Sequence, residues 1–160
     1  MAKVRPTREA SEEKLLGKYV LAFLNYGENA TYEKPMWALL GGQRSADYSA
    51  TADEIDLTDK TDGGYGDAAP GVKATELTLE LIVKPQDETI KQLFDAQDDD
   101  EPVDILRWAK HGRSIRNWYS IISIEETASF EDACVITVSL RGKGKPTYID
   151  DMADPREAEA

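Results

Sequence analysis

A polar, glycine-rich stretch, residues 39–71, is the feature that most constrains how this chain can fold. It reads LLGGQRSADYSATADEIDLTDKTDGGYGDAAPG and separates a short apolar segment from a regular strand pattern. Its glycines give the backbone freedom, and its acidic side chains give it negative charge. Because a long loop without secondary structure is uncommon inside a compact domain and is usually functional, we expect residues 43–71 to form a partner-binding loop.

The composition is that of one soluble globular domain. The chain has 160 residues, of which 41% are hydrophobic and 31% charged, enough for one core. Its formal net charge of −12 disfavours tight binding to nucleic acid or to an anionic membrane, because phosphate contacts need clustered Lys and Arg. We expect three regions: an N-terminal arm at residues 1–16, a β domain at residues 17–146 and a disordered C-terminal tail at residues 147–160.

Apolar patterns predict strands separated by turns. We expect strands at residues 18–25, 31–40, 53–58, 73–83, 103–110, 114–126 and 130–141. Residues 73–83 alternate most regularly, and their predicted core face is Thr75, Leu77, Leu79, Leu81 and Val83. In the last strand we expect the inward residues to be Cys134, Ile136, Val138 and Leu140.

Residues 86–97 are the best candidate for a helix. Asp87 suits its first turn, and Ile90, Leu93 and Phe94 share one face at i, i+3 and i+4. We expect that face to pack on the strands. Together these patterns predict a mainly β fold, an antiparallel β-sandwich or barrel with one flanking helix and a long polar loop.

No set of residues forms a recognisable active site. The only histidine, His111, falls in an expected hairpin turn, and the only cysteine, Cys134, falls on an apolar strand face. One Cys and one His cannot complete a zinc site, and Lys60 occupies a ligand position in the nearest approach to a calcium loop. We therefore expect no enzymatic activity, no cofactor and no metal site, while the acidic run 98–101 leaves opportunistic divalent binding open.

The order of motifs within the polar stretch resembles the major tail (tail tube) proteins of long, non-contractile-tailed bacteriophages. The motifs are Gly-Gly-Gln-Arg-Ser at 41–45, Ala-Asp-Glu-Ile-Asp at 52–56, Gly-Gly-Tyr at 63–65 and Pro-Gly at 70–71. Similar sequences tend to carry Gly-Gly-Trp where this chain has Gly-Gly-Tyr. The resemblance extends over most of residues 17–146.

The resemblance implies a structural virion protein of the siphophage tail. Such a protein assembles as hexameric rings that stack into the tail tube, encloses the tape-measure protein and conducts DNA only transiently through the lumen. The resemblance further implies contacts with tail terminator and baseplate or distal tail proteins. It implies no membrane partner, and a location in the host cytoplasm before assembly.

We assign candidate subunit-interface residues within the polar loop. The expected apolar anchors are Ile55, Leu57 and Tyr65. The expected polar partners are Gln43, Arg44, Asp53, Glu54 and Asp56, and the glycines expected to set the bend are Gly63 and Gly64. We expect the loop to be mobile in the free subunit and ordered in the tube.

A function of a different class also fits the pattern. The chain could be a monomeric carbohydrate- or receptor-binding β-sandwich whose contact residue is Trp37, Trp108 or Tyr65. A cluster of exposed aromatic side chains would favour that alternative, whereas rings or tubes in electron micrographs would favour the tail tube.

Overall fold

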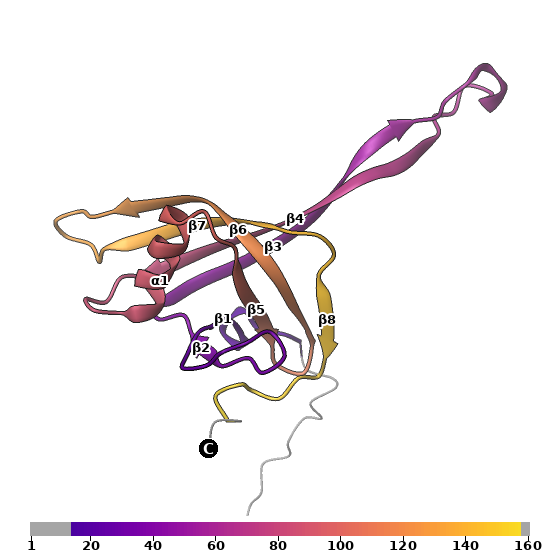
Figure 1. Ribbon diagram of the computed structural model, residues 1–160. Helices are drawn as coiled ribbons and strands as arrows, with labels where there is room; N and C mark the ends of the chain where they lie inside the picture. Colours follow the sequence, from indigo (N-terminus) through magenta and orange to yellow (C-terminus); the bar gives the residue numbers. More distant parts are fainter. Residues whose placement is uncertain (1–13, 158–160) are drawn as a thin grey trace, which may run out of the picture.

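The computed structural model describes residues 14–157 and shows one antiparallel sheet with one α-helix packed on it (Figure 1). The strand order is β2-β1-β5-β6-β7-β4-β3, and β8 pairs with β6. The predicted mainly β fold with one flanking helix is confirmed. The elements are η2 (Gly17–Tyr19), β1 (Val20–Asn25), β2 (Trp37–Leu39), β3 (Gln43–Asp56), η3 (Lys60–Asp62), β4 (Ala68–Ile82), α1 (Glu88–Asp98), β5 (Val103–Ala109), β6 (Arg113–Thr127), β7 (Val135–Gly142) and β8 (Thr147–Asp150).

The long strand β6 joins most of the sheet together. Its first half lies between β5 and β8, and its second half pairs with β7. The C-terminal segment therefore adds a strand to the sheet, and beyond it the Trp108 indole N–H donates to the Met152 carbonyl over 2.8 Å. The prediction of a disordered tail from residue 147 is wrong for these residues. The predicted N-terminal arm lies mostly outside the described residues.

A side-chain amide joins the β3 end of the sheet to β1. Gln43 Oε1 accepts from the Ala22 N–H over 2.8 Å, and Gln43 Nε2 donates to the Ala22 and Leu40 carbonyls, each over 2.7 Å. A glutamine amide offers the same donor and acceptor as a peptide group, so it satisfies the Ala22 N–H and adds a second hydrogen bond to the Ala22 carbonyl, which also accepts from the Leu40 N–H. The sheet curls into a barrel-like shape that this amide helps to close.

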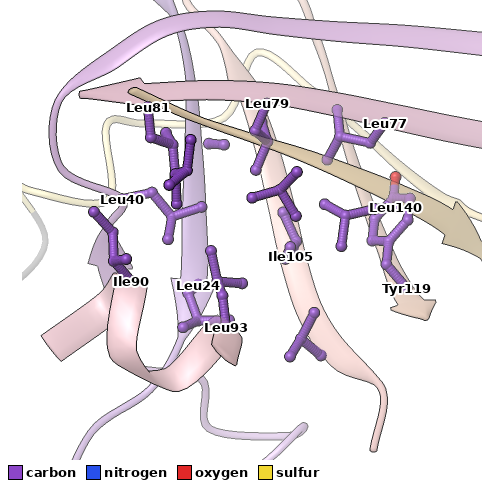
Figure 2. Packing of buried hydrophobic residues seen from close by; sticks show 14 residues of the cluster. Leu24, Leu40, Leu77, Leu79, Leu81, Ile90, Leu93, Ile105, Tyr119 and Leu140 are labelled. Atoms are coloured by element: carbon purple, nitrogen blue, oxygen red, sulfur yellow. The ribbon is translucent and has the colours of Figure 1, made fainter. Parts of the chain in front are cut away.

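The core fills the inside of the curl (Figure 2). Leu77, Leu79 and Leu81 of β4 are fully buried, and they face residues of β1, β5, β6, β7 and α1. Thr75, at the start of the same face, is also buried. The alternation predicted for this strand is confirmed, because burial of one sheet face against a core selects every second residue.

The helix begins after Asp87, whose side chain accepts from the Thr89 N–H over 3.0 Å and caps the N-terminus. Ile90 and Leu93 are buried in the core as predicted. Phe94 is 36% exposed, so its predicted role in packing the helix is wrong. Three apolar residues at i, i+3 and i+4 do not fix the centre of the buried stripe, and here that stripe is completed by Thr89 and Ala96.

Two predicted strands are shorter than expected. Residues 31–40 contribute only β2, since Pro35 lacks the N–H that a paired strand requires. The last strand begins at Val135, and Phe130 lies fully exposed in the preceding loop. Cys134 does not point into the core. It is partly exposed, and its thiol donates to Glu126 Oε1 over 2.8 Å.

Truncation of single side chains on the helix should destabilise the protein much more at the buried Leu93 than at the exposed Phe94. Leu93→Ala should lower the free energy of unfolding by about 2–5 kcal/mol, because it leaves a cavity in the core. Phe94→Ala, at a half-exposed site, should cost about 1 kcal/mol or less. Urea unfolding of both variants measures the difference. Equal losses would show that the helix packs in another orientation.

The Gln43 amide should contribute to stability more than the neighbouring ion pair. Gln43→Ala leaves the Ala22 N–H buried without its partner, so we expect a loss of about 1–3 kcal/mol in the free energy of unfolding. Arg44→Ala is the matched control. It removes an exposed pair with Glu80, 3.6 Å long, and should cost about 0–1 kcal/mol. Thermal and urea unfolding measure both, and a loss for Gln43→Ala no larger than that of the control would argue against closure by this amide.

Candidate assembly interface

The polar stretch is a projecting two-stranded ribbon, not the structureless loop that its sequence suggested (Figure 1). β4 pairs with β7 only between Glu76 and Ile82. Beyond Glu76 it pairs with β3 alone, from Ala50 opposite Thr75 outward to Asp56 opposite Ala68. We call residues 49–73, which include the turn at the far end, the arm.

The arm has no core of its own. Ala69 and Gly71 are half-buried, and all its other residues whose burial the structure describes are exposed. The ribbon gains backbone hydrogen bonds but little apolar burial, and an isolated two-stranded hairpin is at best marginally stable in water. Both edges of the ribbon also leave backbone groups without strand partners, which makes them ready to pair with another chain. The arm therefore has the properties of a segment that needs a partner surface.

A β-bulge near the middle of the arm changes its direction. Ala52 pairs with Lys73 and Glu54 with Pro70, so two residues of β4 stand opposite one residue of β3. One of those two is Gly71, and a side chain there would press against Ile55, whose own side chain packs over the glycine. The sequence Pro-Gly at this point thus supplies a bend in a strand with a free edge, where proline is tolerated.

The far end of the arm is an ordered turn. The Leu57 N–H donates to the Asp67 carbonyl over 2.9 Å, and the Asp67 N–H donates to Thr58 Oγ1 over 2.8 Å. Gly63 and Gly64 then turn the chain with φ of 64° and 88°, a conformation that favours glycine. Their predicted place at the bend is therefore where the structure puts them.

The Asp56 carboxylate holds the start of this turn. Its Oδ1 accepts from the Thr58 N–H over 2.9 Å, an arrangement that lets an aspartate stabilise a turn two residues on. Hydrogen bonds from Thr58, above all from its backbone N–H, keep the pKa of Asp56 below its ordinary value. The charged form of this side chain is therefore the one that stabilises the turn.

The candidate interface residues fall into two groups. Eight lie on the arm, and its apolar anchors Ile55, Leu57 and Tyr65 are exposed, Tyr65 by 81%. Gln43 and Arg44 lie at the base of β3 and bind their own chain, Gln43 to β1 and Arg44 to Glu80. Gln43 thus has an anchoring role within the subunit. The interface role of the arm residues stays a prediction.

Two exposed apolar residues were missed by the sequence analysis. Val72, in the bulge of the arm, is 76% exposed. Phe130 lies fully exposed in the loop between β6 and β7, at the opposite end of the sheet from the arm (Figure 1). Val72 stands just outside the regular alternation of β4, and Phe130 was assigned to a strand. The available signal for Val72 was an apolar residue beside a glycine, and for Phe130 it was an apolar residue beside two acids.

The aromatic residues proposed for ligand binding do not form a platform. Trp108 is buried, Trp37 is half-buried and Tyr65 lies near the far end of the arm. The stacked exposed pair is instead Tyr32 and Trp118, with ring centroids 5.9 Å apart. Both rings line a groove of about 340 Å³ at the C-terminal part of α1, whose other lining residues include the acidic Asp95, Asp99, Glu101 and Asp104.

A buried ion pair fixes that aromatic pair. The Arg116 guanidinium bonds the Asp104 carboxylate at 2.5 Å, and both side chains are almost fully buried. The guanidinium carbon also lies 3.9 Å from the Tyr32 ring centroid. Because both charges are paired within the chain, this arrangement stabilises the fold of the body, by which we mean the sheet and helix without the arm.

The described residues give little support to catalysis. His111 is exposed in the β5–β6 turn, with Nδ1 3.3 Å from Asp151 Oδ1. The hydrogen bond to Glu126, with smaller effects of burial and charge, raises the pKa of the Cys134 thiol and disfavours the reactive thiolate. In the described part of the chain, no three His, Cys, Asp or Glu residues are grouped to hold a metal ion. No helix there is long and apolar enough to cross a membrane.

Comparison with known proteins places the chain among tail components. A family model described as phage tail tube protein matches residues 14–148. None of the curated protein sequences matches the chain. The fold resembles the tail of an empty gene transfer agent particle determined with C6 symmetry, with a TM-score of 0.73 and 17% identity over 85% of this chain and 99% of that one.

Two further structures share the fold. The SPP1 tail tube gives a TM-score of 0.72 at 18% identity, covering 91% of this chain and 84% of that one. The baseplate of the anti-feeding prophage gives 0.63 at 11% identity, covering 96% of this chain and 100% of that one. The predicted fold relationship is confirmed.

Acid should loosen the turn of the arm. Since the pKa of Asp56 is lowered in the folded arm, its stabilising effect is present above the pKa of the unfolded chain and is lost as the pH falls through the folded pKa. We expect the Thr58 amide signal in NMR spectra to change below about pH 4. In Asp56→Asn, which keeps the acceptor but cannot titrate, the signal should stay constant. A titration of Thr58 that is unchanged in this variant would assign the effect to another acid.

Proposed function

We propose that this chain, which belongs to the phage tail tube protein family, assembles through its arm into hexameric rings that stack as a tail tube. Family membership makes it a structural protein of a virus tail. The observation that carries the proposal is the arm, a ribbon without a core whose exposed apolar residues and free edges can be buried only against another surface. The C6 symmetry of the similar gene transfer agent tail supports six copies per ring.

The shape of the subunit also favours an open, repeating assembly. The arm extends from one side of the sheet only (Figure 1). A contact between the arm of one copy and a different surface of the next is head-to-tail. Such contacts close into rings when the rotation between copies allows, and they extend into filaments otherwise. A tube of stacked rings needs contacts of both kinds, one set within each ring and another between successive rings.

The same role suggests the other partners. We propose that the tube encloses a tape-measure protein and meets tail terminator and baseplate or distal tail proteins at its ends, with the subunit in the host cytoplasm before assembly. The similar fold in the anti-feeding prophage baseplate supports a fold shared by neighbouring tail components. The net charge of −12 would limit adhesion of DNA passing through the lumen.

Removal of the arm tests the proposal. The arm can be shortened without touching the body, because Thr51 pairs with Ala74 and residues 52–73 can be replaced by Asn-Gly, which favours a two-residue hairpin turn. We expect this variant to fold as a soluble monomer whose circular dichroism spectrum keeps the shape of a β protein, with a smaller signal because the deletion removes the outer parts of β3 and β4. Wild-type protein at the same concentration should form rings or tubes in negative-stain electron micrographs.

The deletion must start beyond the base of β3. The Arg107 guanidinium donates to the Ala46 carbonyl over 2.8 Å, and Tyr48 packs against the core. A larger deletion, of residues 46–67, would remove these contacts and confuse loss of assembly with loss of folding. Tubes formed normally by the short-arm variant would refute the role of the arm. A wild-type protein that stays monomeric at all concentrations and binds sugars would favour the carbohydrate-binding alternative.

A further inference from the structure

A cationic surface with an apolar centre lies where β1 begins and β5 turns into β6. We call it the basic patch and define it by the exposed cations Lys14, Lys18, Lys110 and Arg113 and the exposed apolar residues Leu15, Leu16 and Tyr19. It stands out in a chain whose net charge is −12. Nothing in the tail-tube assignment so far explains it.

Direct contacts of Lys18, Lys110, Tyr19 and Leu15 join the two segments that form the basic patch. The Lys18 and Lys110 ammonium groups lie 5.0 and 4.7 Å from the Tyr19 ring centroid, so two cations flank one aromatic ring. The Lys110 N–H also donates to the Tyr19 carbonyl over 3.2 Å. The Leu15 side chain reaches the turn at Gly112. The patch is therefore one surface, although its residues come from two segments.

The charge of the patch is positive after its own acids are counted. Arg113 pairs with Asp150 at 3.4 Å, and His111 pairs with Asp151 at 3.3 Å. All four side chains are more than half exposed, so these pairs contribute little stability. Four cations less two acids leave a charge of +2 with His111 neutral.

The arm has the opposite charge. Its six acids less two lysines give −4, the acids being Asp53, Glu54, Asp56, Asp59, Asp62 and Asp67 and the lysines Lys60 and Lys73. It also carries exposed apolar side chains, among them Ile55 and Val72. Arm and patch thus match in both respects, with opposite charge around exposed apolar groups, and this is the usual composition of two surfaces that recognise each other.

We propose that the basic patch is the surface that receives the arm of a neighbouring copy, an inference that rests on the proposed function. The arm of the same copy points away from the β5–β6 turn, so the contact joins two subunits (Figure 1). Residues 49 and 56 of the ribbon are seven steps of about 3.3 Å apart, so the ribbon extends roughly 23 Å beyond the rest of the sheet. Lys18 and Lys110 meet the acids of the arm, and Leu15, Leu16 and Tyr19 cover its apolar residues.

A charge exchange tests the contact. Lys18→Glu with Lys110→Glu should raise the critical concentration for assembly at least about tenfold, because like charges then face each other. Asp53→Lys with Glu54→Lys should also raise the critical concentration, because cations of the arm then face cations of the patch. These two side chains take no part in the hydrogen bonds of the turn that involve Asp56, Thr58 and Asp67. The four substitutions together restore opposite charges and should return the critical concentration to within about threefold of wild type.

Lys84→Glu with Lys91→Glu is the matched control. These lysines are exposed, lie outside the patch and change the net charge by the same amount. The control should assemble like wild type. Sedimentation at a series of protein concentrations measures assembly, and circular dichroism with thermal unfolding shows that each variant is folded.

The outcomes separate this inference from the proposed function. Suppose that wild type forms tubes and the Lys18→Glu, Lys110→Glu variant assembles equally well, or that the variant with all four substitutions keeps a raised critical concentration. In either case the basic patch is not the receptor of the arm, and the tail-tube role stands. If that variant keeps assembly but loses measurable binding to duplex DNA in fluorescence anisotropy, the patch serves nucleic acid and the inference is wrong. If wild type never assembles, the proposed function fails and the inference fails with it.

Discussion

The pairing of β4 with β7 ends at Glu76, and the shape of the whole molecule follows from this limit. Between Glu76 and Ile82 one face of β4 is buried against the core, and the burial of its leucines offsets the entropy lost in ordering the strand. Beyond it β3 and β4 have only each other. The chain continues the ribbon with small and charged residues, which lets it stay soluble while it leaves its edges open to a partner.

The body is built so that the direction of this ribbon is fixed. The Gln43 amide ties the base of β3 to β1, and Arg107 holds the Ala46 carbonyl beside it. Gly42, with φ of 68°, makes the preceding turn at a place where any side chain would collide with Ile82. A ribbon with a rigid base and a bulge near its middle can be presented to a neighbour in one orientation, which reduces the entropy lost on assembly.

The sequence predicted the parts of the fold in which burial imposes a simple period. Thr75 to Leu81 alternate because one face of a strand meets a core, and the structure agrees. The sequence also predicted a short strand at residues 53–58 but missed that residues 43–52 are also a strand, since Ala and Asp are depleted in strands and the pairing with β4 orders this segment. Phe94 and Cys134 were misplaced because periodicity gives a face but not its exact centre. The basic patch was invisible because its cations come from two segments that only the fold brings together.

In the proposed assembly the arm is stabilised by a neighbouring copy and not by its own subunit. Hydrogen exchange of the free subunit and of the assembled tube tests it most directly, with the amides of β4 between Leu77 and Leu81 as an internal reference. We predict that amides of residues 49–73 exchange at least about tenfold more slowly in the tube, equivalent to about 1.4 kcal/mol, while the reference is unchanged. Equal protection of the arm in both states would show that no neighbouring copy stabilises it.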